Sequence, residues 1–142
     1  MTNRRSTLVL ALLCLSLAAM APSRALAQDK PPAIDGYDPV AYFTEKKPVQ
    51  GKTEFSQVFD ERRYLFSSAK HRDLFVGNPE RYEPQFNGLC AGNVAGGKKM
   101  KAIPTIWRVV EGKLYLFAGP QQDDEAVAKK VVLAQAKWKE IK

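Results

Sequence analysis

The chain has 142 residues, with 22 Lys and Arg, 15 Asp and Glu, one His and two Cys, and a formal net charge of +7. This length suits a single domain and excludes a two-domain enzyme with a separate cofactor fold. Aromatic residues make up 10% of the chain and charged residues 26%, which predicts a packed core and excludes wholesale disorder.

The first 27 residues have the pattern of an export signal. Arg4 and Arg5 precede an uncharged run rich in Leu and Ala, residues 8–20, and Ala25-Leu26-Ala27 follows as a small-residue cleavage site. Cleavage after Ala27 predicts a periplasmic or secreted protein. The apolar run is shorter than the roughly 20 residues that span a bilayer, so we expect no membrane span after the signal is removed. The general secretory and twin-arginine routes both remain open.

Removal of the signal changes the charge and the cysteine count. Residues 1–27 contain three Arg and no acid, so residues 28–142 keep 19 basic and 15 acidic side chains and a net charge of +4. This modest excess, together with export, argues against a nucleic-acid partner. Cys14 is lost with the signal, and Cys90 then has no second cysteine with which to form an internal disulfide.

The sequence predicts one α+β domain over residues 34–142, after a polar, Pro-rich and flexible lead-in at 28–33. Its first part reads as a short helix capped by Asp38 with Pro39 at the first position, then strands at 55–59 and 63–66. A helix over 69–76 follows a Ser67-Ser68 cap, with an inward face of His71, Leu74 and Phe75. One further turn is expected at 79–82.

The second part begins with a glycine-rich segment, 86–101, in which we interpret residues 92–99 as a flexible turn. A second hairpin is predicted from strands at 106–110 and 113–117. A long C-terminal helix starts near Gln122, with acids at its start and lysines at its end. Its apolar stripe should pack on the sheet and consists of Val127, Val131, Ala134, Trp138 and Ile141. No internal repeat is evident in the sequence.

A run of motifs resembles the YHS domain, in particular its exported, stand-alone members. The main motif is the segment 64–75, Tyr-Leu-Phe-Ser-Ser-Ala-Lys-His-Arg-Asp-Leu-Phe, followed by Asn-Pro-Glu-Arg-Tyr at 78–82. Gly-Tyr-Asp-Pro-Val at 36–40 and Phe-Asn-Gly-Leu-Cys-Ala at 86–91 resemble two further elements of that family. The resemblance covers roughly residues 34–117. Because YHS domains accompany metal-transporting ATPases and oxygenases, it implies metal handling, with copper or another soft metal as the ion, or assistance to an envelope metalloprotein or transporter.

The metal-binding version of that family carries cysteines where this chain has Ala41 and Ser67, so most of a thiolate site for a soft metal is missing. His71 and Cys90 remain as the candidate metal ligands. Met100 and the oxygens of Asp35 and Asp38 could add donors, but Met100 lies in a stretch of lysines, whose charge would repel a cation.

Both candidate ligands also have a structural interpretation. Cys90 is either a small buried apolar side chain, a soft ligand, or a reactive thiol. His71 is either a hydrogen-bonded core histidine or a metal ligand. No catalytic constellation is recognisable, so we predict a protein that is not an enzyme. A metal-handling domain is the first hypothesis, a non-metal structural or protein-interaction module of the cell envelope is the alternative, and a thiol enzyme that uses Cys90 is the least favoured.

Overall fold

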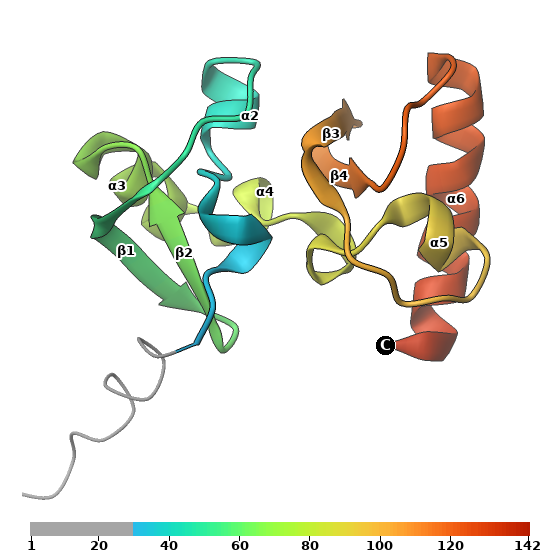
Figure 1. Ribbon diagram of the computed structural model, residues 1–142, viewed down its shortest axis with the longest axis horizontal. Helices are drawn as coiled ribbons and strands as arrows, with labels where there is room; N and C mark the ends of the chain where they lie inside the picture. The colour runs from blue at the N-terminus through green and yellow to red at the C-terminus, as the bar shows by residue number, and fades with distance from the viewer. Residues whose placement is uncertain (1–29) are drawn as a thin grey trace, which may run out of the picture.

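The structure is a computed structural model that describes residues 30–142. The predicted export signal, residues 1–27, lies outside the described residues. The described part is a small α+β domain, as the sequence predicts, built from two separate two-stranded antiparallel sheets, several short helices and one long helix (Figure 1). The sheets consist of β1 (Lys52–Phe59) with β2 (Arg62–Phe66) and of β3 (Ile103–Val110) with β4 (Lys113–Phe117).

The first half of the domain surrounds the sheet β1–β2. It begins with the 3-10 turn η1 (Ala33–Gly36) and the short helix α2 (Ala41–Thr44), and it ends with α3 (Ala69–Gly77) and α4 (Pro79–Tyr82). Ser68 caps α3 by accepting a hydrogen bond from the His71 backbone N–H, as the Ser-Ser cap predicts. The two residues of the hairpin turn, Asp60 and Glu61, both have positive φ, which matches the twist of the strands.

The second half surrounds the sheet β3–β4. It begins with the 3-10 turn η2 (Gln85–Gly88) and the helix α5 (Ala91–Ala95), and it ends with α6 (Asp124–Ile141). Helix α5 corrects the first part of the expected flexible turn at 92–99, while residues 96–99 lie outside any helix. Glycines lower helix propensity, but Ala91 and Val94 are fully buried in the core beside α6, and this tertiary packing outweighs the local preference.

The two halves repeat the same order of turn, short helix, hairpin and helix, which the sequence did not reveal. Three consecutive residues with positive φ occur at 34–36 and again at 86–88. Each turn leads to a short helix and then to a hairpin with an eight-residue and a five-residue strand, and each hairpin has an irregularity near the same place. The bridge from Tyr37 to Gln50 has its counterpart in the bridge from Leu89 to Lys101. The fold therefore contains an internal repeat.

The repeat produces two apolar cores that meet in the middle. The core of the first half contains Val40, Tyr64, Phe66, Phe75 and Tyr82, and the larger core of the second half contains most other buried side chains, Cys90 included. Phe43 packs against both cores. Tyr42 reaches from α2 into the second core, where its hydroxyl donates a hydrogen bond to the Pro104 carbonyl at 2.9 Å. Burial raises the pKa of this hydroxyl, and the bond joins the two halves.

Two local expectations differ from the structure. Leu74, expected on the inward face of α3, is 36% exposed, whereas His71 and Phe75 are buried. Helix α2 begins at Ala41 rather than directly after Asp38, because Pro39 and Val40 form a turn in which Asp38 Oδ1 accepts the Val40 backbone N–H. Within residues 30–142, no helix is long and apolar enough to cross a membrane.

A glycine substitution tests the close approach of the chain to β2. A Cβ atom at Gly51 would lie 2.6 Å from the Leu65 carbonyl carbon, whereas at Gly77 it would meet nothing within 4 Å. We expect Gly51→Ala to lower the free energy of unfolding by about 1–3 kcal/mol, the usual cost of overpacking. Chemical denaturation measures the change. Gly77→Ala is the control, and an equal effect of both variants would contradict the packing described.

Candidate functional site

The most heavily bonded polar side chain of the first half is Asp38, which is fully buried. Its Oδ1 accepts the Val40 backbone N–H at 2.9 Å, and its Oδ2 accepts the Ser67 backbone N–H at 2.8 Å and the Ser67 hydroxyl at 2.7 Å. His71 Nδ1 lies 2.6 Å from the same Oδ2. A buried carboxylate is tolerated only when its oxygens are paired in this way, so these contacts hold α2, β2 and α3 together.

His71 continues this network towards the surface. The residue is 8% exposed, and its Nε2 lies 3.2 Å from Thr44 Oγ1 and 3.9 Å from Glu45 Oε1. His71 Nδ1 thus faces the Asp38 carboxylate, and Nε2 faces the Thr44 hydroxyl oxygen. Thr44 Oγ1 also lies 3.1 Å from the Val40 carbonyl, to which it donates.

The order carboxylate, imidazole and hydroxyl is that of an acid–base relay. Here, however, Thr44 is bonded within its own helix. Asp38, His71 and Thr44 do not line either of the two cavities described below. The arrangement therefore supports a structural polar core better than a reaction centre.

Cys90 occupies the corresponding place in the second half. It is 4% exposed, precedes α5 as its N-cap, and its Sγ accepts the Ala118 backbone N–H at 3.2 Å. Ala118 follows β4 as Ser67 follows β2, so this bond repeats the one from the Ser67 N–H to Asp38. The Cys90 backbone N–H bonds to the Met100 carbonyl at 2.9 Å, as the Asp38 N–H bonds to the Val49 carbonyl at 2.8 Å. The thiol thus replaces the carboxylate of the first half.

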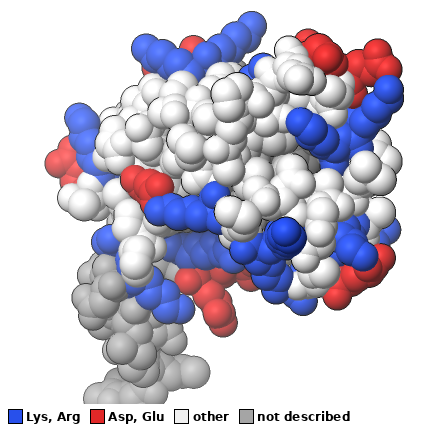
Figure 2. Space-filling model, turned by 45° about the vertical axis from the view of Figure 1, so that its right-hand side comes forward, with Lys and Arg blue, Asp and Glu red and all other residues white. Residues whose placement is uncertain are grey.

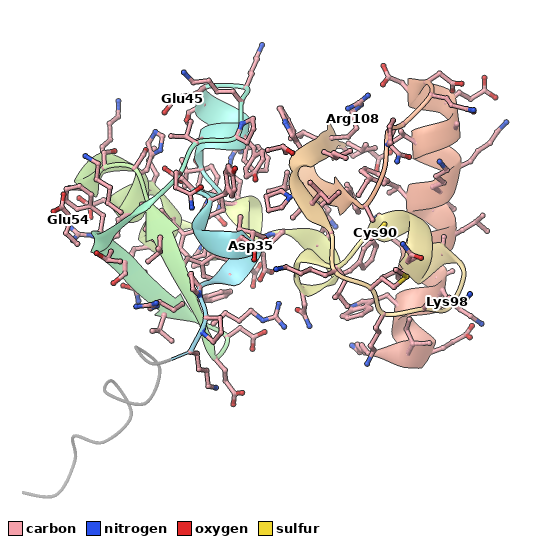
Figure 3. All side chains as sticks on the ribbon, viewed as in Figure 1. Asp35, Glu45, Glu54, Cys90, Lys98 and Arg108 are labelled. Atoms are coloured by element: carbon pink, nitrogen blue, oxygen red, sulfur yellow. The ribbon has the colours of Figure 1, made fainter. Side chains whose placement is uncertain are left out.

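The structure does not bring the two predicted metal ligands together. His71 lies on α3 beside the first sheet, and Cys90 lies beside β4 and α5 in the second half, at the opposite side of the molecule (Figures 1 and 3). Met100 is 49% exposed, and Asp35 forms an ion pair with Lys101 at 2.6 Å. Among residues 30–142, no group of three or more His, Cys, Asp and Glu side chains is placed to hold a metal ion.

Sequence reasoning missed the central position of Asp38, which it treated as a helix cap and a spare oxygen donor. It also missed Ser67 and Thr44 as partners of the Asp38–His71 pair. A signal was present: an aspartate between apolar residues, Gly-Tyr-Asp-Pro-Val-Ala-Tyr-Phe, needs buried partners if its neighbours enter the core.

Two cavities lie elsewhere on the described surface. The larger, about 480 Å³, is acidic and open, and it is lined by Phe59, Asp60, Glu80, Glu83, Gln85 and Lys113. Burial, and then the charges of Asp60 and Glu80, raise the pKa of Glu83. The smaller, about 230 Å³, lies between the halves, with Ile34, Asp35, Gly88 and Leu89 among its lining residues.

Comparisons of the chain with protein-family models, with curated proteins and with solved structures gave no match. The resemblance to the YHS domain therefore stays a prediction.

Removal of the Asp38 carboxylate should destabilise the fold strongly. Asp38→Ala leaves the Val40 and Ser67 N–H groups and His71 without their buried acceptor, and we expect a loss of about 3 kcal/mol or more in the free energy of unfolding. Asp73→Ala is the control, because the Asp73 side chain is 67% exposed and should matter little. Similar denaturation midpoints for the two variants would contradict the role of Asp38.

The raised pKa of Glu83 predicts a dependence of stability on pH. The folded state binds the Glu83 proton more tightly than the unfolded state does. The contribution of this proton to stability is therefore fully present below the pKa that Glu83 has in the unfolded chain. It is lost as the pH rises through the pKa that Glu83 has in the folded chain. Glu83→Gln should therefore raise the melting temperature at pH 7 relative to wild type and should have little effect near pH 4. The gain is small, about 0.5 kcal/mol or less, because solvent screens the group. A gain of the same size at both pH values, or for the exposed Glu54→Gln, would refute this.

Proposed function

We propose that the protein is an exported, YHS-type protein-interaction module of the cell envelope. It acts through a basic loop, defined as residues 96–103, and not through a metal ion held by His71 and Cys90. The resemblance supports the class of module. His71 and Cys90 each bond to protein groups in separate halves, and these bonds support the non-metal form of the module over the metal-binding form.

A single observation carries the proposal: the basic loop exposes apolar side chains next to lysines. Met100 is 49% and Ile103 44% exposed. Lys99 and Lys101 flank Met100 in the chain, and Ile103 follows two residues after Lys101. Exposed apolar side chains next to cationic groups offer both apolar and charged contacts to a partner, and methionine adapts its shape to a partner. Figure 2 shows Lys and Arg gathered below the centre of the visible face, and Lys98 lies near the edge of the molecule below α5 (Figure 3).

Hydrogen bonds hold the base of the loop in place. The N–H groups of Gly96 and Lys98 both bond to the Asn93 carbonyl, at 3.0 and 2.9 Å, and the Met100 carbonyl accepts the Cys90 N–H. Gly97 has a φ of 75°, which favours glycine. A loop anchored in this way loses less conformational entropy on binding.

The chemistry of the loop indicates a partner with an acidic and partly apolar surface. Lys101 already shows this preference within the chain through its ion pair with Asp35. An envelope metalloprotein or transporter with such a surface fits the proposal. The interaction should weaken as salt rises, because exposed charges are screened over about 8–10 Å at 0.1–0.15 M ionic strength.

The metal-handling alternative needs His71 and Cys90 at one ion. In the folded chain, each is instead bonded to protein groups of its own half. Copper binding by both residues would require these bonds to break and the halves to rearrange. The non-metal module needs no such change.

Two measurements separate the alternatives. Titration of residues 28–142 with Cu(I) under reducing conditions and with Zn(II) should show no stoichiometric site with a dissociation constant below about 1 μM. Wild type, His71→Ala and Cys90→Ala should behave alike. A tight site that both substitutions abolish would overturn the proposal in favour of metal handling.

In the second measurement, immobilised protein is exposed to an envelope extract. The triple variant Lys98→Glu, Lys99→Glu, Met100→Ser should lose the partner that wild type retains. Lys70→Glu, a charge change on exposed α3 surface, should keep it. Equal retention by the triple variant would show that the basic loop is not the binding surface.

A further inference from the structure

Helix α6 has an apolar outer face that nothing in the described chain covers. Val127, Val131 and Ala134 are buried against the second half. On the opposite side lies an outer stripe, defined as Glu125, Ala128, Val132, Ala136 and Lys139, all exposed. Val132 is 64% and its neighbour Leu133 60% exposed, more than any other large apolar side chain described. The spacings of 3, 4, 4 and 3 place the stripe along one face of the helix.

The outer stripe is symmetric about Val132. An alanine lies four residues before and four residues after it, and a glutamate and a lysine lie seven residues before and after it. If a second copy of α6 packs antiparallel across a two-fold axis at Val132, then Val132 meets its own copy. Ala128 then meets Ala136 of the second copy, and Glu125 meets Lys139 of the second copy, each contact occurring twice. Such self-complementarity is what an isologous interface requires.

The charges at the two ends of α6 favour the same orientation. Asp123, Asp124 and Glu125 are at the start, and Lys137, Lys139 and Lys142 at the end. An antiparallel pair brings the acidic start of each helix to the basic end of the other and opposes the helix dipoles. Figure 2, in which this side comes forward, shows uncharged surface between charged groups at the upper right and at the lower right.

We propose that the protein self-associates through the outer stripe of α6, as an antiparallel pair of helices related by a two-fold axis. The small alanines allow a close approach of the two helices. Stable interfaces bury about 800 Å² per partner, and one helix face offers less, so the pair is weak and reversible. This surface is separate from the basic loop, and the inference does not rest on the proposed function.

Sedimentation equilibrium of the purified protein, at concentrations up to about 1 mM, tests the pairing. We expect a monomer–dimer equilibrium with a dissociation constant of roughly 10–300 μM, in the weak range for a small interface. Val132→Glu should weaken the dimer at least tenfold. Val76→Glu, which changes another exposed apolar side chain, 52% exposed on α3, should leave the dissociation constant unchanged. Circular dichroism and melting temperature verify that both variants fold.

A charge exchange tests the orientation. Glu125→Lys alone places two lysines opposite each other at both ends of the interface and should weaken the dimer. The double variant Glu125→Lys, Lys139→Glu restores opposite charges and should recover the affinity to within about threefold. A protein that stays monomeric at 1 mM overturns the proposal and leaves the outer stripe to a different partner. Failure of the double variant to recover, or dimerisation of Val132→Glu equal to wild type, overturns it as well.

Discussion

The buried carboxylate of Asp38 is the constraint on which the first half depends. A charge in the core costs several kcal/mol unless its oxygens are paired, so the start of α2, the end of β2 and the first turn of α3 must meet where they supply N–H and hydroxyl groups. His71 fills the last position and carries the network on to Thr44 at the end of α2. Asp38 and His71, the two residues that suggest a chemical role, thus stabilise one another.

The internal repeat explains why His71 and Cys90 are apart. Each half uses one side chain at the same place, after the left-handed turn, to accept the N–H that follows the second strand of its hairpin. In one half this acceptor is a carboxylate with a histidine partner, and in the other it is a thiol in an apolar core. The halves diverge most in the helix that follows each hairpin, which has nine residues in α3 and eighteen in α6. The additional length of α6 creates the only long outer helix face in the described chain.

Local signals in the sequence were sufficient for most elements. Both hairpins, the Ser68 cap and the apolar stripe of α6 depend on residues close in the chain, and the structure confirms them. Helix α5 was missed because glycines lower helix propensity and only packing against the second core restores it. The repeat was missed because, besides the identical Tyr-Leu-Phe triplets at 64–66 and 115–117, the halves share backbone angles and hydrogen bonds more than side chains.

The sequence by itself determined the α+β class, the order of the hairpins and helices, and the short list of residues with chemical potential, because these follow from composition and from contacts between near neighbours. Only the tertiary structure decided which of these residues contact one another and which lie apart. It paired Asp38 with His71 across 33 residues, placed Cys90 in the other core, and left the basic loop and the outer face of α6 exposed. These outcomes depend on how distant segments pack, and no local periodicity encodes which buried polar group finds which partner.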